Sequence, residues 1–92
     1  MNHLINDPKA TIIDVRTPEE FMDEHAPDSI NIPLHEIPKR LAEIKAMSQP
    51  LIMCCRSGAR SGNATQWLRA QGIQEVYNAG PWTEVAYYQS MK

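Results

Sequence analysis

The chain contains 92 residues, the size of one domain, and we expect residues 1–92 to fold as a single unit. Hydrophobic residues make up 42% of it and charged residues 22%, a composition that excludes a disordered chain. The net charge of −2 argues against a nucleic-acid partner, and no apolar run approaches the roughly 20 residues that span a membrane.

Short apolar runs alternate with helix signals along the chain. The run Thr17-Pro18-Glu19-Glu20 gives the clearest helix start, because Thr17 can cap a helix and Glu20 can complete a capping box. The predicted elements are, in order, a strand at 10–15, a helix at 17–25, a strand at 29–32, a helix opened by Pro38, a strand at 51–54, a helix at 61–71, a strand at 75–78, a turn at 79–81 and a helix at 82–91. Strands that alternate with helices pair in parallel, so we expect an α/β fold: a small open parallel sheet of four or five strands flanked by helices.

The chain has two cysteines, Cys54 and Cys55, and they are adjacent. This number excludes a disulfide framework, and neighbouring strand residues point to opposite faces, so we expect two free thiols, as in a reducing compartment. Two cysteines are too few for a closed structural zinc site, and no histidine stands at a metal-ligand spacing from them, so we expect no metal. No secretory signal is visible, which predicts a cytoplasmic protein, or a periplasmic one if a leader has been trimmed.

The segment from Cys55 to Arg60 joins the third predicted strand to the helix that follows it. Ligands of open parallel sheets bind beyond the carboxyl ends of the strands, where Cys55 stands. A loop that enters a helix aims several backbone N–H groups at one point, Gly58 permits the curvature, and Arg56 and Arg60 add positive charge. Each effect lowers the pKa of a thiol, so the loop predicts a nucleophilic thiolate beside an anion site. The candidate catalytic residue is Cys55, and the candidate substrate-binding residues are Arg56, Ser57, Gly58, Ala59 and Arg60.

A cysteine at the end of a strand is more often a small buried hydrophobic residue than a nucleophile. No bulky apolar residue follows Cys55 to cover it, which favours the nucleophile at that position. Cys54 is the last residue of the predicted strand, and we expect it to be a packed, inert thiol.

Three segments of the chain carry motifs of a known family. They are Asp14-Val15-Arg16 with Glu20-Phe21 and residues 27–33, the loop from Cys55 to Ser61, and Asn78-Ala79-Gly80 with Trp82. Together they resemble the rhodanese family of sulfurtransferases over residues 11–88. In its short length the chain is similar to the single-domain sulfurtransferases of the bacterial phage-shock type. The strand and helix that precede the first motif in the family are nearly absent here, so we expect a sheet one strand shorter than usual.

The resemblance implies that Cys55 attacks the outer sulfur of thiosulfate, releases sulfite and becomes a persulfide. A thiol or cyanide then accepts that sulfur in a second step. The backbone N–H groups of residues 56–60 would stabilise the persulfide, and Arg56 and Arg60 would bind the small anionic donor. The resemblance implies no metal or organic cofactor, and we expect a monomer with no nucleic-acid or membrane partner.

Two other functions stay open. Counted from Cys54, five residues precede Arg60, which is the spacing of Cys-based phosphatases and arsenate reductases, whose loops resemble those of rhodaneses but are one residue longer. That alternative makes Cys54 the nucleophile. A rhodanese-like domain can also serve only as a binding module, although such domains usually lack the cysteine.

Polar residues outside the loop are expected to be mainly structural. We expect Asp14 to bond to backbone N–H groups or to Arg16, and Arg16 to form an ion pair with Glu19 or Glu20. Ser61 is ambiguous, because its hydroxyl can either cap the following helix or contact a substrate.

Overall fold

The computed structural model describes all 92 residues and has four parallel strands at its centre. They are β1 (Thr11–Asp14), β2 (Ile30–Asn31), β3 (Leu51–Cys55) and β4 (Val76–Pro81). The strands lie in the order β2–β1–β3–β4. The expected small open parallel sheet is therefore confirmed, with four strands.

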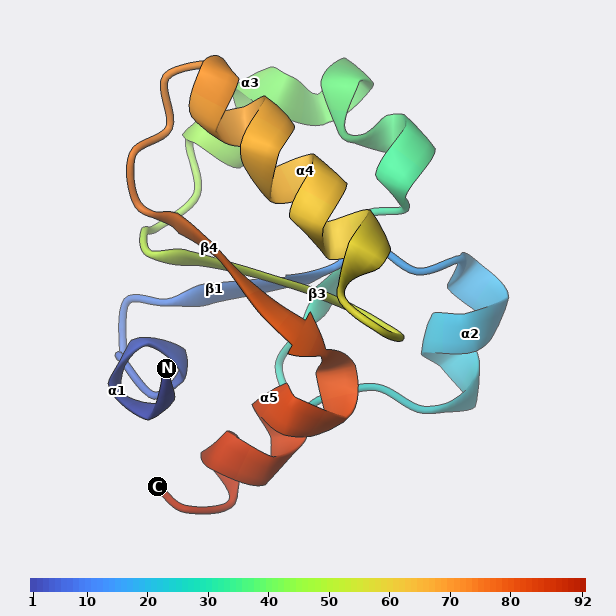
Figure 1. Ribbon diagram of the computed structural model, residues 1–92, viewed down its shortest axis with the longest axis vertical. Helices are drawn as coiled ribbons and strands as arrows, with labels where there is room; N and C mark the ends of the chain where they lie inside the picture. The colour runs from blue at the N-terminus through green and yellow to red at the C-terminus, as the bar shows by residue number, and fades with distance from the viewer.

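Helices cover both faces of the sheet. They are α1 (Asn2–Ile5), α2 (Pro18–Asp23), α3 (Leu41–Lys45), α4 (Ala59–Ala70) and α5 (Trp82–Gln89), with 3-10 helices at Leu34–Glu36 and Pro38–Arg40. Helices α3 and α4 lie on one face and α1 and α5 on the other, while α2 lies at one end (Figure 1). None of these helices combines the length and the apolar character that crossing a membrane requires.

The central strand β3 is buried along its whole length and separates two apolar cores. Leu51, Met53 and Cys55 belong to the core that α3 and α4 cover. Ile52 and Cys54 belong to the core that α1 and α5 cover. The two cysteines therefore point to opposite faces, as the alternation of side chains along a strand requires.

Several helix boundaries differ from the sequence prediction. The helix predicted to reach residue 25 ends at Asp23, because Glu24 is extended and its carbonyl oxygen accepts a hydrogen bond from Arg16. The helix predicted to begin at residue 61 begins at Ala59, because Gly58 adopts a left-handed conformation (φ 106°) that closes the loop early. The segment opened by Pro38 is a 3-10 turn before the short α3, and α1 was not predicted.

Residues 79–81, predicted as a turn, are the end of β4. The pairing of β3 with β4 shifts between Met53 and Cys54, so that Cys54 stands opposite Gly80 and Cys55 opposite Pro81. Beyond this irregularity β4 runs beside the end of β3, and Gly80 lies beside the loop that follows Cys55.

Candidate active site

Cys55 is the last residue of β3, and two donors converge on its sulfur. The backbone N–H of Gly58 donates to Cys55 Sγ over 3.0 Å, and the Ser61 hydroxyl lies 3.3 Å from the same sulfur. Both donors belong to the turn into α4 and to its first residues. The residue itself has no exposed surface. The structure thus combines a buried thiol with hydrogen-bond donors aimed at its sulfur.

The pKa of Cys55 is lower than that of an ordinary cysteine. Burial disfavours the thiolate, but the Ser61 hydroxyl and the amides of Ser61, Gly58 and Ser57 together outweigh that effect. Hydrogen bonds donated to a thiolate favour its charged form. The local geometry therefore supports an ionised, nucleophilic sulfur.

Cys54 has the opposite character. It is fully buried among apolar side chains, and burial raises its pKa to about 12, with the nearby Asp14 carboxylate adding to the rise. The expectation that Cys54 is packed in the core is confirmed, and its high pKa agrees with the prediction that it is inert. A phosphatase-like reaction needs Cys54 as a thiolate, and this environment strongly disfavours that form.

The tip of the loop is open to solvent. Arg56, Ser57 and Ala59 are exposed, and the Arg56 guanidinium takes part in no ion pair. Gly58 is in close contact with β4: a Cβ atom at this position would lie 3.2 Å from Gly80 Cα. The backbone of the loop is therefore held against β4, while Arg56 is free to attract an anion.

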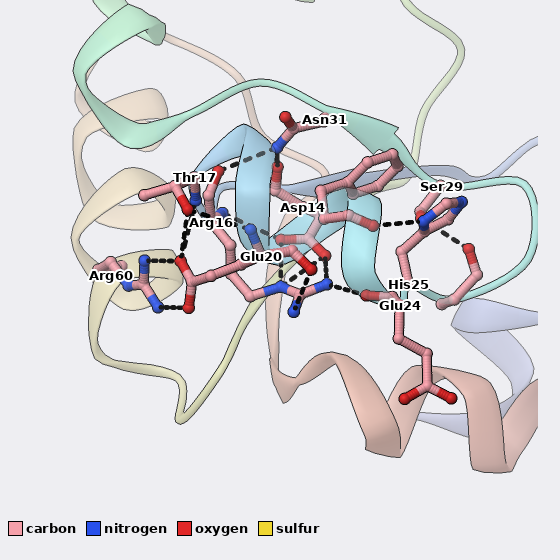
Figure 2. A network of polar contacts seen from close by, with 11 residues as sticks. Asp14, Arg16, Thr17, Glu20, Glu24, His25, Ser29, Asn31 and Arg60 are labelled. Atoms are coloured by element: carbon pink, nitrogen blue, oxygen red, sulfur yellow. Dashed lines mark hydrogen bonds and ion pairs between the residues drawn. The ribbon is translucent and has the colours of Figure 1, made fainter.

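Unlike Arg56, Arg60 takes part in an ion pair. Its guanidinium forms two hydrogen bonds with the Glu20 carboxylate, at 2.7 and 3.1 Å (Figure 2). Arg60 is the main cause that lowers the pKa of Glu20 to about 2, and the pair raises the pKa of Arg60. Glu20 thus neutralises the charge of Arg60 and joins the first turn of α4 to α2, while the binding of an anionic substrate by Arg60 stays a prediction.

Arg16 differs from its expected pairing as well. It pairs with the buried Asp14, whose oxygens accept from Arg16 Nε, Nη2 and the Arg16 amide at 2.8–3.0 Å. Its remaining N–H groups donate to the carbonyl oxygens of Glu20 and Glu24 (Figure 2). Its guanidinium lies over the ring of Trp82, 5.0 Å from the centroid. The expected ion pair with the Glu19 or Glu20 side chain is wrong, but the structural role of Asp14 and Arg16 is confirmed.

Sequence reasoning missed Asn78 as part of the site. Asn78 Oδ1 accepts from the Ser61 hydroxyl at 2.7 Å and from the Gly80 amide at 3.0 Å, and its Nδ2 donates to the Gly58 carbonyl at 3.0 Å. One signal in the sequence could have indicated this role: Asn78 lies near the carboxyl end of the strand that pairs with the Cys55 strand, where ligands of parallel sheets bind. Ser61 does not cap α4, since Gly58 occupies the cap position.

A cavity of the molecule lies away from the Cys55 loop. It has a volume of about 530 Å³ and is lined by residues between the end of α1 and β1, by Pro27 and Asp28, and by the C-terminal end of the chain from Ala86 onward. No residue of the Cys55 loop lines it. The site at Cys55 is a loop with an exposed tip around a buried sulfur.

Comparison with known proteins agrees with this geometry. Residues 1–83 match the family model of the rhodanese-like domain. The chain is 43% identical over 70 residues to the uncharacterized protein YqhL of Bacillus subtilis, covering 76% of this chain and 55% of that protein. It is 37% identical over 75 residues to the thiosulfate sulfurtransferase PspE of Escherichia coli, covering 80% of this chain and 72% of that protein. A solved structure described as a rhodanese with anions from E. coli matches with a TM-score of 0.76 at 36% identity, covering 84% of this chain and 92% of that one.

The chain therefore belongs to the rhodanese family and has the rhodanese fold. Relatives named as sulfurtransferases place it among rhodanese-like sulfurtransferase homologues. The chain spans only a little over half of the length of YqhL.

Proposed function

We propose that this protein is a sulfurtransferase that carries a sulfane sulfur on Cys55, taken from thiosulfate or a similar small anionic donor. The observation that supports this most is the convergence of the Gly58 amide and the Ser61 hydroxyl on Cys55 Sγ. Both donors favour the thiolate, which is the attacking form of the sulfur. Similarity to PspE, which is named as a thiosulfate sulfurtransferase, supports the same class of donor.

In the first step the Cys55 thiolate attacks the outer sulfur of thiosulfate. A bond forms between these two sulfur atoms, the S–S bond of thiosulfate breaks, and sulfite leaves with the bonding electron pair. Arg56 attracts the anionic oxygens of the donor, because its guanidinium is exposed and has no partner within the protein. Cys55 then carries a persulfide.

In the second step a thiolate or cyanide attacks the outer sulfur of the persulfide. The bond to Cys55 Sγ breaks, and Cys55 leaves as a thiolate with the electron pair. The N–H of Gly58 stabilises the charge that returns to Sγ, as it stabilised the attacking thiolate. The cycle needs no external oxidant or reductant, because each bond that forms replaces one that breaks.

Access to the sulfur is a further requirement of this reaction. Cys55 has no exposed surface, whereas Arg56 and Ser57 at the tip of the loop are exposed. A donor therefore reaches Sγ after a small displacement of residues 56–58. Small reactants need the smallest displacement, which favours thiosulfate-sized donors over bulky ones.

Matched alanine variants of the two cysteines test the proposal. In a thiosulfate:cyanide assay that measures thiocyanate, Cys55→Ala is expected to fall to background, because it removes the sulfur that carries the transferred atom. Cys54→Ala is expected to keep most of the activity, because its side chain lies in the other core.

The opposite result, a dead Cys54→Ala and an active Cys55→Ala, would move the nucleophile to Cys54 and support the phosphatase-like alternative. A wild-type protein that transfers no sulfur from any small anionic donor would support the binding module instead.

A further inference from the structure

The buried hydroxyl of Ser61 has a choice of three acceptors. Ser61 is fully buried, and its Oγ lies 2.7 Å from Asn78 Oδ1, 3.2 Å from the Gly58 carbonyl oxygen and 3.3 Å from Cys55 Sγ. A hydroxyl has one proton, so it donates to one of these acceptors at a time. The amide oxygen of Asn78 is the nearest of the three, and the sulfur is the only one whose charge changes in the proposed reaction.

We propose that the Ser61 hydroxyl is a catalytic group of the sulfur transfer, which donates to Asn78 Oδ1 while Cys55 Sγ is neutral and turns to Sγ when the sulfur is negatively charged. This inference rests on the proposed function and adds a residue to it. Hydrogen bonds to ionised acceptors are roughly twice as strong as those between neutral groups, which favours the turn. The sulfur is negative when it attacks the donor and again when it leaves the persulfide, so the hydroxyl assists both steps.

The acceptor that the hydroxyl leaves stays satisfied. Asn78 Oδ1 also accepts from the Gly80 amide at 3.0 Å, so the turn leaves no unpaired oxygen behind. The amide group is held by the bond from Asn78 Nδ2 to the Gly58 carbonyl at 3.0 Å. Gly62 leaves room for it, because a Cβ atom there would lie 3.3 Å from Nδ2. Asn78 is thus a positioning residue that acts through Ser61.

The loop does not depend on Asn78 alone. The Gly58 carbonyl oxygen also accepts the amide of Gly62 at 2.8 Å, which is the first hydrogen bond of α4. Asn78 is an exposed residue, so removing its side chain leaves no buried cavity. Loss of Asn78 therefore removes the neutral-state acceptor of Ser61 while the Gly58 amide keeps its place near Sγ.

The other charged groups around Cys55 are held by their own partners. Arg60 in α4 is paired with Glu20 in α2, and Asp14 at the end of β1 is paired with Arg16. Arg56 is exposed at the loop tip, and the neighbouring Cys54 stays a thiol because burial raises its pKa to about 12. Substitution of the hydroxyl or of its acceptor leaves all of these groups in place.

The test measures the rate of Cys55 alkylation by iodoacetamide as a function of pH. Ser61→Ala is expected to raise the midpoint of this profile by about one unit, the value of one hydrogen bond to a charged group. Asn78→Ala is expected to lower the midpoint by roughly half a unit, because only the neutral state loses its acceptor. The double variant is expected to match Ser61→Ala, since Asn78 acts through the hydroxyl.

Two matched variants serve as controls. Thr65→Val removes another buried hydroxyl of α4, one turn further on, whose hydrogen bond goes to the Ser61 carbonyl oxygen. Asn31→Ala removes another asparagine that holds the backbone, through the carbonyl oxygens of Asp14 and Arg16. Both are expected to leave the alkylation midpoint unchanged, even where they lower the melting temperature.

An unchanged midpoint in Ser61→Ala would overturn the proposal. A raised midpoint in Asn78→Ala, or the same shift with and without the Ser61 hydroxyl, would also overturn it and make Asn78 a simple loop anchor. Alkylation needs no sulfur donor, so these outcomes do not depend on whether thiosulfate is a substrate. Slower discharge of the persulfide to cyanide in Ser61→Ala is the expected companion result.

Discussion

Glu20 links two helices that are far apart in the sequence. Its side chain completes the capping box of α2, where Oε1 accepts the Thr17 amide at 3.0 Å. The same carboxylate binds both terminal nitrogens of Arg60, at the start of α4. The residue that completes the capping box of α2 therefore also holds the helix whose N-terminal turn contacts the Cys55 sulfur.

The pH dependence of stability tests this link. The pKa of Glu20 is lowered from 4.5 to about 2, so its contribution to folding is fully present above the ordinary value and is lost as the pH falls through about 2. The difference in unfolding free energy between wild type and Glu20→Gln is therefore expected to be constant near neutral pH and to shrink in this acidic window. Denaturant titrations at a series of pH values measure it.

Glu19→Gln is the matched control, because Glu19 is an exposed acid in the same helical turn and has no arginine partner. The link is contradicted if both variants show the same pH dependence.

The capping box of Thr17 and Glu20 could be predicted from the sequence because all its groups lie within four residues. The bond to Arg60 could not, because it joins residues 40 positions apart and depends on the placement of α4 against α2. Arg16 is a different case, because Asp14, Glu19 and Glu20 are all close to it in the sequence. Asp14, which is buried at the end of β1, is the acid that its guanidinium pairs with.

At the scale of elements, the turn from β3 into α4 determines the geometry around the sulfur. Gly58 caps α4 with a φ of 106°, and its backbone packs against Gly80 at the end of β4. The sequence predicted glycine in a curved loop but began the helix two residues late. The left-handed cap that shortens the loop is a property of the backbone that composition does not reveal.

Two glycine substitutions distinguish the effect of the left-handed backbone conformation from the effect of the contact with Gly80. Gly58→Ala and Gly72→Ala both place a side chain in a left-handed conformation, at a cost of about 1–2 kcal/mol. Only Gly58→Ala adds a contact, at 3.2 Å from Gly80 Cα, whereas nothing lies within 4 Å at Gly72. We expect Gly58→Ala to lose more stability in denaturant titrations and to lose sulfur transfer, while Gly72→Ala keeps it.

Equal losses of stability and of sulfur transfer in the two glycine variants would show that the contact with Gly80 does not matter. A fully active Gly58→Ala would show that the left-handed cap is not needed to aim the amide at the sulfur.

The sequence prediction ended the last strand at residue 78, whereas β4 continues to Pro81. The sequence Asn78-Ala79-Gly80-Pro81 has the composition of a turn. The irregular pairing with β3 and the bond from the Gly80 amide to Asn78 Oδ1 keep it extended instead. The extended strand brings Asn78 and Gly80 to the Cys55 loop. Because the prediction placed a turn at residues 79–81, it also missed Asn78 as a residue of the site.

At the scale of the whole molecule, the sheet separates two cores and presents the site at one end. The alternation of strands and helices was enough to predict this arrangement and to place Cys55 at the carboxyl end of a central strand. The short α1 could not be predicted, because it depends on contact with α5, including the bond from Asn6 Nδ2 to the Tyr88 carbonyl oxygen at 2.9 Å.

The most direct test of the central claim is the mass of the protein after brief treatment with thiosulfate. Intact mass spectrometry of wild type and Cys54→Ala is expected to show the gain of one sulfur atom, which dithiothreitol removes. Cys55→Ala is expected to show no gain. An added sulfur that persists in Cys55→Ala, or none in the wild type, would contradict the assignment of Cys55 as the sulfur carrier.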